Sequence, residues 1–257
     1  MKPMERFALF IALPLLMTGC GRKGALMYPD MLVPEAPTII DARQSGTAVR
    51  LEFALPEKNR VGGVMPPISG VRISKRARNT DHESFCRSCT TGYQLFQRIY
   101  SDALPPSVQR NGKQLVVIDE EVTSGFTYSY NLVPFMADGV EGAAAEIGEM
   151  PVVPSRAAPV VTLELTPTEI SLHVTTLPSS AETVVGFNLY RSTADQSRSS
   201  LPLNKEPCTG GEYHDTAVER GMTYRYVVRM VFRGKDGHLV ESLPSPEVRG
   251  TLKEDND

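Results

Sequence analysis

The sequence predicts an all-β fold made of two tandem β-sandwich modules. The strongest observation is an internal repeat, because the pattern Asp-x-x-Val-x-x-Gly-x-Thr-Tyr-x-Tyr occurs at residues 119–130 and again at residues 215–226. Identical spacing in two places indicates two copies of one folding unit. The 257 residues also contain 20 glycines and 20 prolines. Many of them lie between short apolar runs, which is typical of strands separated by turns.

Alternating runs predict the same early strand in both copies. Apolar and polar residues alternate at 48–53 and at 169–174, so one face of each strand is expected to be buried and the other to face water. The expected buried positions are Val49, Leu51, Phe53, Ile170, Leu172 and Val174. Segments 69–73 and 185–191 predict the middle strands of the two modules.

Turn sequences predict where the chain reverses. Arg110-Asn-Gly-Lys113 precedes an apolar run and is typical of a tight hairpin. Asp138-Gly139 and Asp236-Gly237 are expected to form hairpin turns in which glycine adopts a positive φ. A Leu-Pro pair follows each early strand, where proline cannot donate a hydrogen bond to the sheet.

The order of strands and turns resembles that of the fibronectin type III domain, an immunoglobulin-like sandwich, over about residues 34–252. The family's strand with the sequence Leu-x-Pro-Gly-Thr-x-Tyr is matched, without its proline, by Val122, Gly125, Tyr128, Val218, Gly221 and Tyr224. The resemblance implies that Tyr128 and Tyr224 are tyrosine corners, with the ring in the core and the hydroxyl bonded to nearby backbone. The family's core tryptophan is missing, and Leu51 and Leu172 are the expected substitutes.

Residues 1–19 have the features of a bacterial signal peptide. Lys2 and Arg6 precede the apolar segment 7–17, which is too short to span a bilayer but suits the hydrophobic region of an export signal. The following Met-Thr-Gly-Cys20 resembles the lipobox of bacterial lipoproteins. The resemblance implies cleavage before Cys20 and attachment of a lipid, detectable with labelled palmitate, to its thiol. An ordinary cleaved signal with an incidental cysteine is the alternative.

Residues 20–35 are expected to form a tether between this lipid anchor and the first module. Cys20-Gly-Arg-Lys-Gly-Ala-Leu-Met-Tyr-Pro29 resembles the start of small bacterial lipoproteins linked to assembly of the lipopolysaccharide transporter. Asp after the cysteine signals inner-membrane retention in enterobacterial lipoproteins. Gly21 at this position therefore implies, by analogy, a lipid anchor in the outer membrane, with the face left open. The basic residues of the tether suit anionic headgroups.

The expected modules comprise residues 36–154 and 155–252, followed by an acidic tail at 253–257. The first copy is longer than the second by about 20 residues, which fall around 75–89 and form a loop insertion. Residues that differ between the two copies are better candidates for a specific function than residues that the copies share. The insertion is therefore the expected site of partner binding.

The insertion contains the chain's only Cys-x-x-Cys sequence, at Cys86 and Cys89. Exported proteins fold in an oxidising environment, so a Cys86–Cys89 disulfide is expected. A metal site with His82 is the less favoured alternative, because zinc prefers four ligands. A redox role is also less favoured, because it needs a helix N-terminus to lower the thiol pKa. Cys208 is left open between a free thiol, a bond to this pair and a cross-link between two molecules.

Neither a catalytic group nor a cofactor or metal is expected. The four histidines are scattered, and no nucleophile motif or phosphate-binding glycine loop occurs. The net charge of −3 argues against a nucleic-acid partner, which requires a basic face. Asp119 and Asp215 occupy matched repeat positions and are expected to be structural.

The function expected from these features is that of a lipid-anchored, non-catalytic protein of the bacterial cell envelope. It would present sandwich loops to a protein or glycan partner, or act as a spacer. The alternative is an accessory factor in outer-membrane assembly that acts through its N-terminal segment. The partner's identity and the oligomeric state are left open.

Overall fold

The computed structural model describes residues 29–79, 92–175, 183–196, 199–234 and 236–254. These residues contain one 3-10 helix, η1 (Pro29–Met31), and otherwise only β-strands as regular elements. The predicted all-β fold is thereby confirmed. No helix within the described ranges is long and apolar enough to cross a membrane.

The first module is a sandwich of two antiparallel sheets. Its strands are β1 (Thr38–Ser45), β2 (Ala48–Ala54), β3 (Gly70–Asn79), β4 (Gln94–Tyr100), β5 (Val108–Asn111), β6 (Gln114–Asp119), β7 (Phe126–Phe135) and β8 (Ala145–Pro151). One sheet has the order β1-β2-β6-β5 and the other has the order β4-β3-β7-β8. Val49, Leu51 and Phe53 are fully buried in the core between them, as the alternation predicts.

The second module repeats this plan with fewer strands. Its strands are β9 (Val160–Leu165), β10 (Ile170–Thr175), β11 (Thr183–Thr193), β12 (Glu212–Asp215), β13 (Thr223–Arg233), β14 (Leu239–Glu241) and β15 (Val248–Thr251). One sheet has the order β12-β10-β9, and in the other β13 pairs with β11, β14 and β15. Ile170, Leu172 and Val174 point into the second core, as predicted.

The predicted hairpin turns form at the expected positions. Gly139 and Gly237 both have a φ of 86°, in the region that glycine adopts without strain. Asp138 and Asp236 each accept a hydrogen bond, through Oδ1, from the backbone N–H two residues later, at 3.0 and 3.2 Å. The hairpin at 110–113 joins β5 to β6. The turns therefore form at the Asp-Gly and Asn-Gly positions that predict them.

One expectation about β2 is wrong. The alternation predicts a face open to water, but every residue from Ala48 to Phe53 is buried. Arg50 and Glu52, at the positions expected to be wet, are only 3% and 8% exposed. The second module covers the outer face of this sheet, where Arg50 Nη1 donates to the carbonyl oxygen of Ser200 at 3.2 Å. The alternation of apolar and polar residues predicts which face of a strand is buried within its own sandwich. It does not predict whether a neighbouring module covers the other face.

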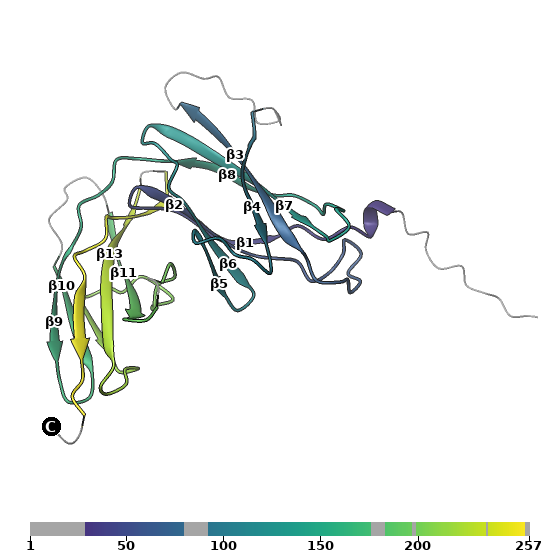
Figure 1. Ribbon diagram of the computed structural model, residues 1–257. Coiled ribbons are helices and arrows are strands. Elements are labelled where there is room, and N and C mark those ends of the chain that lie inside the picture. The colour runs from purple at the N-terminus through teal and green to yellow at the C-terminus, as the bar shows by residue number, and fades with distance from the viewer. Residues whose placement is uncertain (1–28, 80–91, 176–182, 197–198, 235, 255–257) are drawn as a thin grey trace, which may run out of the picture.

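The two modules share one continuous sheet (Figure 1). β14 of the second module pairs in parallel with β1 of the first, with Gln44 opposite Val240 and Ser45 opposite Glu241. This pairing merges the β13-containing sheet with the β1-β2-β6-β5 sheet into eight strands. The first module extends toward the N-terminal segment, and the second module lies at its other end.

Candidate functional site

The repeated sequence pattern encodes a buried ion pair in the first module. Asp119, at the end of β6, is fully buried. Its Oδ2 accepts a hydrogen bond from the Tyr130 hydroxyl at 2.8 Å and lies 2.9 Å from Lys75 Nζ. Burial, together with the neighbouring Asp119 carboxylate, raises the pKa of Tyr130 far above its ordinary value, so the phenol remains a proton donor.

The second module repeats this ion pair at matched positions. The Tyr226 hydroxyl donates to Asp215 Oδ2 at 2.8 Å, and Arg191 Nη1 lies 2.8 Å from the same oxygen. Asp215 is 2% exposed. The cations come from the middle strands β3 and β11, each five residues after the glycine of that strand. Asp119 and Asp215 therefore hold strands together.

The two tyrosines named by the family resemblance also take matched positions. The Tyr128 hydroxyl accepts a hydrogen bond from the Thr123 N–H at 2.8 Å, and the Tyr224 hydroxyl accepts one from the Glu219 N–H at 3.0 Å. Both side chains are buried, at 4% and 5% exposure. Each bond links a strand to the backbone five residues upstream, which is the geometry of a tyrosine corner.

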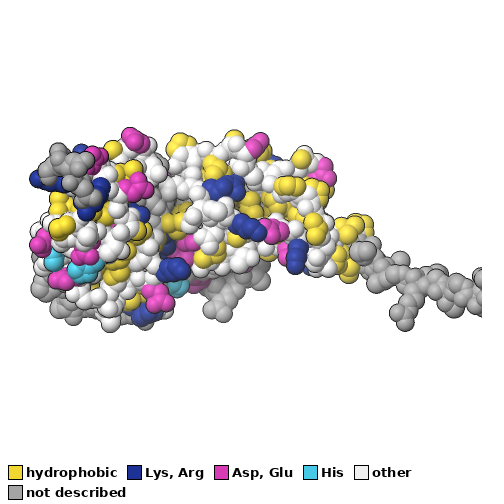
Figure 2. All heavy atoms as spheres, turned by 90° about the horizontal axis from the view of Figure 1, so that it is seen from below, with side chains coloured by type: hydrophobic (Ala, Val, Ile, Leu, Met, Phe, Trp, Pro, Cys, Tyr) yellow, Lys and Arg dark blue, Asp and Glu magenta, His cyan; other side chains and the backbone are white. Residues whose placement is uncertain are grey.

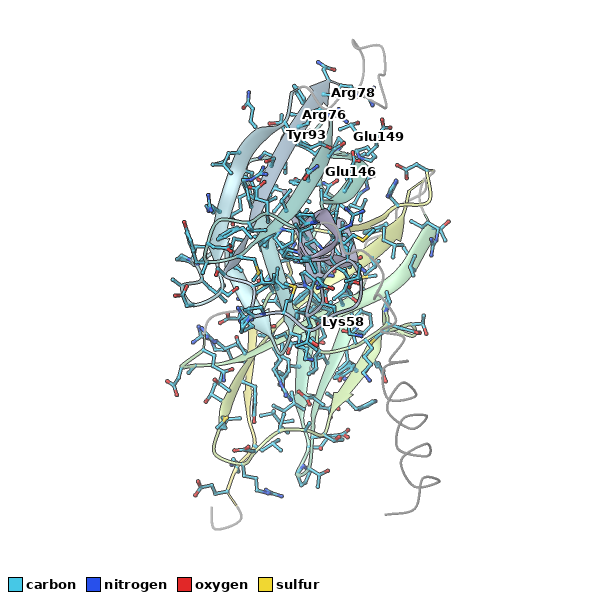
Figure 3. All side chains as sticks on the ribbon, turned by 90° about the vertical axis from the view of Figure 1, so that its right-hand side faces the viewer. Lys58, Arg76, Arg78, Tyr93, Glu146 and Glu149 are labelled. Atoms are coloured by element: carbon cyan, nitrogen blue, oxygen red, sulfur yellow. The ribbon has the colours of Figure 1, made fainter. Side chains whose placement is uncertain are left out.

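The loop insertion predicted around 75–89 is wrong at its start, because residues 75–79 continue strand β3 and pair with β7. The described residues on either side of segment 80–91 include a cluster of charged side chains on the β3 and β7 sheet. His82, Cys86 and Cys89 lie outside the described residues, so their disulfide or metal chemistry stays a prediction. At the base, Tyr93 donates its hydroxyl hydrogen to Glu146 at 3.0 Å and lies under the Arg76 guanidinium, 4.9 Å from the ring centre. This base also includes an ion pair between Arg78 and Glu149, at 3.3 Å (Figure 3).

Cys208 carries a free thiol in the second module. The backbone of Cys208 pairs with Phe187 in both directions, at 2.8 and 2.9 Å. The thiol is half-buried, and this burial raises its pKa. A raised thiol pKa lowers the fraction of reactive thiolate.

Two of the described histidines, His173 and His214, are paired with carboxylates on the outer face of the second module. His173 lies between Glu164, at 3.5 Å, and Glu212, at 3.2 Å. His214 lies 3.0 Å from Glu169. Among the residues that the structure describes, no group of three or more His, Cys, Asp or Glu is arranged to hold a metal ion.

A polar network that the sequence did not reveal joins the two modules. Glu241, on β14, is fully buried. Its carboxylate accepts hydrogen bonds from Asn188 at 2.5 Å, from Tyr190 at 2.7 Å and, across the junction, from Ser45 at 2.5 Å. Burial and the adjacent Glu241 raise the pKa of Tyr190. We call Ser45, Gln44, Arg50 and Glu241 the junction residues.

Gln44 and Arg50 complete this junction from the first module. The Gln44 side-chain amide donates to the Val153 carbonyl at 2.8 Å and accepts from the Val153 N–H at 2.9 Å, which fixes the chain between the modules. Arg50 donates to Asp41 at 2.7 Å. Burial lowers the pKa of Arg50, but the surrounding Tyr190, Glu241 and Asp41 raise it by more, so the guanidinium stays charged. The junction therefore contains paired charges rather than a flexible polar linker.

The junction is bordered by a polar cleft. A cavity of about 760 Å³ lies between the β5 hairpin and the end of β11, lined by Gln109, Asn111, Thr193 and Gln196 among others. A second cavity, of about 330 Å³, is lined by Arg50, Glu120, Tyr190 and Arg229. Such a cleft between modules, with amide and hydroxyl groups on both sides, is a typical position for a ligand. The cleft is the candidate binding site within the described residues.

Comparisons with known proteins add little to this geometry. No family model and no curated protein matches the sequence. Among solved structures, the FN1–FN3 domains of chicken CNTN1 share 13% identity, with 86% of this chain and 69% of that chain covered and a TM-score of 0.31. The chicken interferon gamma receptor alpha chain also shares 13% identity, with 85% and 98% covered and a TM-score of 0.31. The strand order and register of this chain, and not these overlaps, define a protein of two tandem β-sandwiches.

Proposed function

We propose that this protein is a lipid-anchored, extracytoplasmic binding or spacer protein of the bacterial envelope, without catalytic activity. The signal-like segment 1–19 and the lipobox-like sequence ending at Cys20 support the location. Asp119 and Asp215 are engaged in hydrogen bonds inside the sandwiches, which supports a binding role over a catalytic role for these two residues.

The observation that carries the proposal is the junction. A spacer or a presenting scaffold must hold its parts at a defined angle, and a flexible pair of modules would not do so. The shared sheet, the buried Glu241 and the bidentate contacts of Gln44 supply that constraint. Inter-domain contacts usually allow motion unless they are large or well paired, so this degree of pairing favours a fixed geometry.

The ends of β3 give the protein a direction. β3 begins at Gly70, on the side where the N-terminal segment enters, and ends at Asn79, where the insertion begins. A chain anchored at Cys20 would therefore hold the insertion away from the membrane. The partner that this arrangement fits is a protein or a glycan of the envelope, bound by the insertion, the junction cleft or both.

Capture from envelope extracts tests this proposal. The anchored chain should retain a discrete envelope component, and replacing residues 80–91 by a glycine-serine linker of equal length should weaken the capture several-fold. The matched control replaces residues 176–182, which follow β10 in the second module, and should leave capture unchanged. Capture that survives the first replacement removes the insertion from the binding surface and leaves the junction cleft.

Location is tested separately by labelling. The chain should incorporate labelled palmitate, and Cys20→Ser should abolish the incorporation. Equal labelling of the wild type and the variant would contradict the lipoprotein proposal.

A second function, assistance in outer-membrane assembly through residues 20–29, is favoured only by the resemblance of that segment to lipoproteins of transporter assembly. A transplant distinguishes the two. Residues 1–29 fused to an unrelated soluble domain would rescue a deletion phenotype only if the modules are dispensable.

A further inference from the structure

Three segments meet at the end of the first module where the described chain begins. The stretch 31–36 pairs with the loop between β2 and β3, where the Arg60 N–H donates to the Val33 carbonyl at 3.1 Å. The same stretch accepts at Pro34 a hydrogen bond from the Ala143 N–H, at 2.8 Å, after the β7 turn. We call this surface, formed by residues 31–36, 57–67 and 136–143, the N-terminal tip.

The N-terminal tip exposes an unusual number of apolar side chains. Its exposed hydrophobic residues are Met31 at 36%, Leu32 at 53%, Val61 at 47%, Val64 at 91% and Val140 at 42%. Figure 2 shows hydrophobic side chains gathered at this end, next to the start of the described chain. Single exposed apolar residues are ordinary, but a contiguous group at one end of a module indicates a surface that contacts something apolar.

The turn structure of the loop between β2 and β3 keeps Val61 and Val64 exposed. Asn59 is 7% exposed, and its side-chain oxygen accepts hydrogen bonds from the Val61 N–H at 3.2 Å and the Gly63 N–H at 2.7 Å. This buried cap fixes the turn in a shape that points Val61 and Val64 outward. The tip carries the exposed basic residues Lys58 and Arg60 and the exposed acidic residues Glu35, Glu57, Asp138 and Glu141. Its apolar side chains, and not its net charge, therefore favour a contact with the membrane interface.

The length of the preceding chain decides what covers the tip. Only eight residues, 21–28, lie between Cys20 and Pro29, and at about 3.3 Å per residue the span from 20 to 29 is at most roughly 30 Å. If Cys20 carries a lipid, this tether keeps the tip within that distance of the bilayer, where it can contact the surface. The several acyl chains of a lipobox anchor hold the chain end on the membrane but do not fix how the first module is oriented, so a second apolar contact would orient it.

We propose that the N-terminal tip inserts Leu32, Val61 and Val64 into the headgroup region of the bilayer, so that the first module stands on the membrane in one orientation. This inference rests on the proposed lipid anchor, and it adds a second membrane contact made by the folded module itself.

Tryptophan probes test this directly, because the chain contains no tryptophan. The full lipidated chain carrying Val64→Trp is reconstituted in vesicles of phosphatidylethanolamine and phosphatidylglycerol that contain brominated lipid. The control is Leu165→Trp, at a position 49% exposed on β9 of the second module. The Val64→Trp emission should be blue-shifted and quenched several-fold more than the control. Equal emission and equal quenching in the two variants would overturn the proposal.

Two further outcomes separate the alternatives. Concentration-dependent blue-shifted emission of Val64→Trp without vesicles would indicate a second copy of this chain on the tip, and would overturn the membrane contact. Palmitate on Cys20 together with a water-exposed Val64→Trp would reject only the tip insertion, whereas absence of palmitate would reject the proposed function. Val64 is almost fully exposed, so unchanged thermal unfolding of the variant should show that the substitution leaves the fold intact.

Discussion

The two modules carry the same buried ion pair but differ at their edges. In both, an aspartate at the end of a short strand binds a tyrosine hydroxyl and a cation from the middle strand. Among the described residues, the first module has the additional strand β4, whereas the last strand of the second module is divided into β14 and β15, of which β14 pairs with β1. The shared parts maintain the sandwich, and the divergent edges supply the junction and the candidate binding surfaces.

The largest expected effect is the loss of either buried aspartate. Asp119→Ala and Asp215→Ala should each lower the free energy of unfolding by about 3 kcal/mol, because each leaves a buried tyrosine hydroxyl and a cation without its partner. Chemical denaturation measures the loss, with the exposed Asp102→Ala as control. A large loss from one aspartate and none from the other would break the equivalence of the two modules.

Removal of Glu241 should have a smaller effect on stability and a distinct effect on cooperativity. Glu241→Ala removes the acceptor shared by Asn188, Tyr190 and Ser45, and because Ser45 is only partly buried the total cost should be about 2 kcal/mol. The two modules of the variant should then unfold in separate transitions by calorimetry, whereas the wild type should unfold in one. A single unchanged transition in the variant would contradict the role of Glu241 in coupling the modules.

The corner tyrosines provide a matched pair of weaker tests. Tyr128→Phe and Tyr224→Phe each remove an acceptor of one backbone N–H, so each should cost about 1 kcal/mol of unfolding free energy. Thermal or chemical denaturation measures both losses. Equal losses would support the equivalence of the two modules, and destabilisation of only one variant would contradict it.

The smallest expected effect is on the pH dependence. Burial raises the pKa of Asp41, but the hydrogen bonds and charges of Arg43 and Arg50 outweigh it and hold the pKa below its ordinary value of 3.8. A depressed carboxyl pKa adds stability that is present above 3.8 and is lost as the pH falls through the folded-state pKa. Asp41→Asn should therefore reduce the acid sensitivity of unfolding. An unchanged pH profile in the variant would contradict this.

The sequence predicted those features that are local or repeated. The alternation around Leu51 and Leu172 identified one core strand in each module, and Asp-Gly pairs located the turns, because periodicity and positive φ depend on neighbouring residues only. The repeat indicated that Asp119 and Asp215 are equivalent, but not which cation would face them. That partner comes from a different strand, and its position depends on how the sheets pack.

The junction could not be predicted in the same way. Gln44 and Glu241 are polar residues whose burial depends on the meeting of two sheet edges nearly two hundred residues apart. One signal was present: Arg50 and Glu52 are charged at positions where the second copy has Ser171 and His173. These charges lie on the face of the strand that is expected to be exposed to solvent. A charge that is present there in one copy and absent from the other indicates that this face forms an interface in the first copy.

The claim that most of this account depends on is that the two modules form one unit with a fixed geometry. Residual dipolar couplings of the backbone N–H groups test it most directly, because they report the orientation of each module in a common frame. The account predicts that couplings from β3, β7, β11 and β13 fit a single alignment tensor on the structure. Two tensors of different magnitude, one for each module, would contradict it.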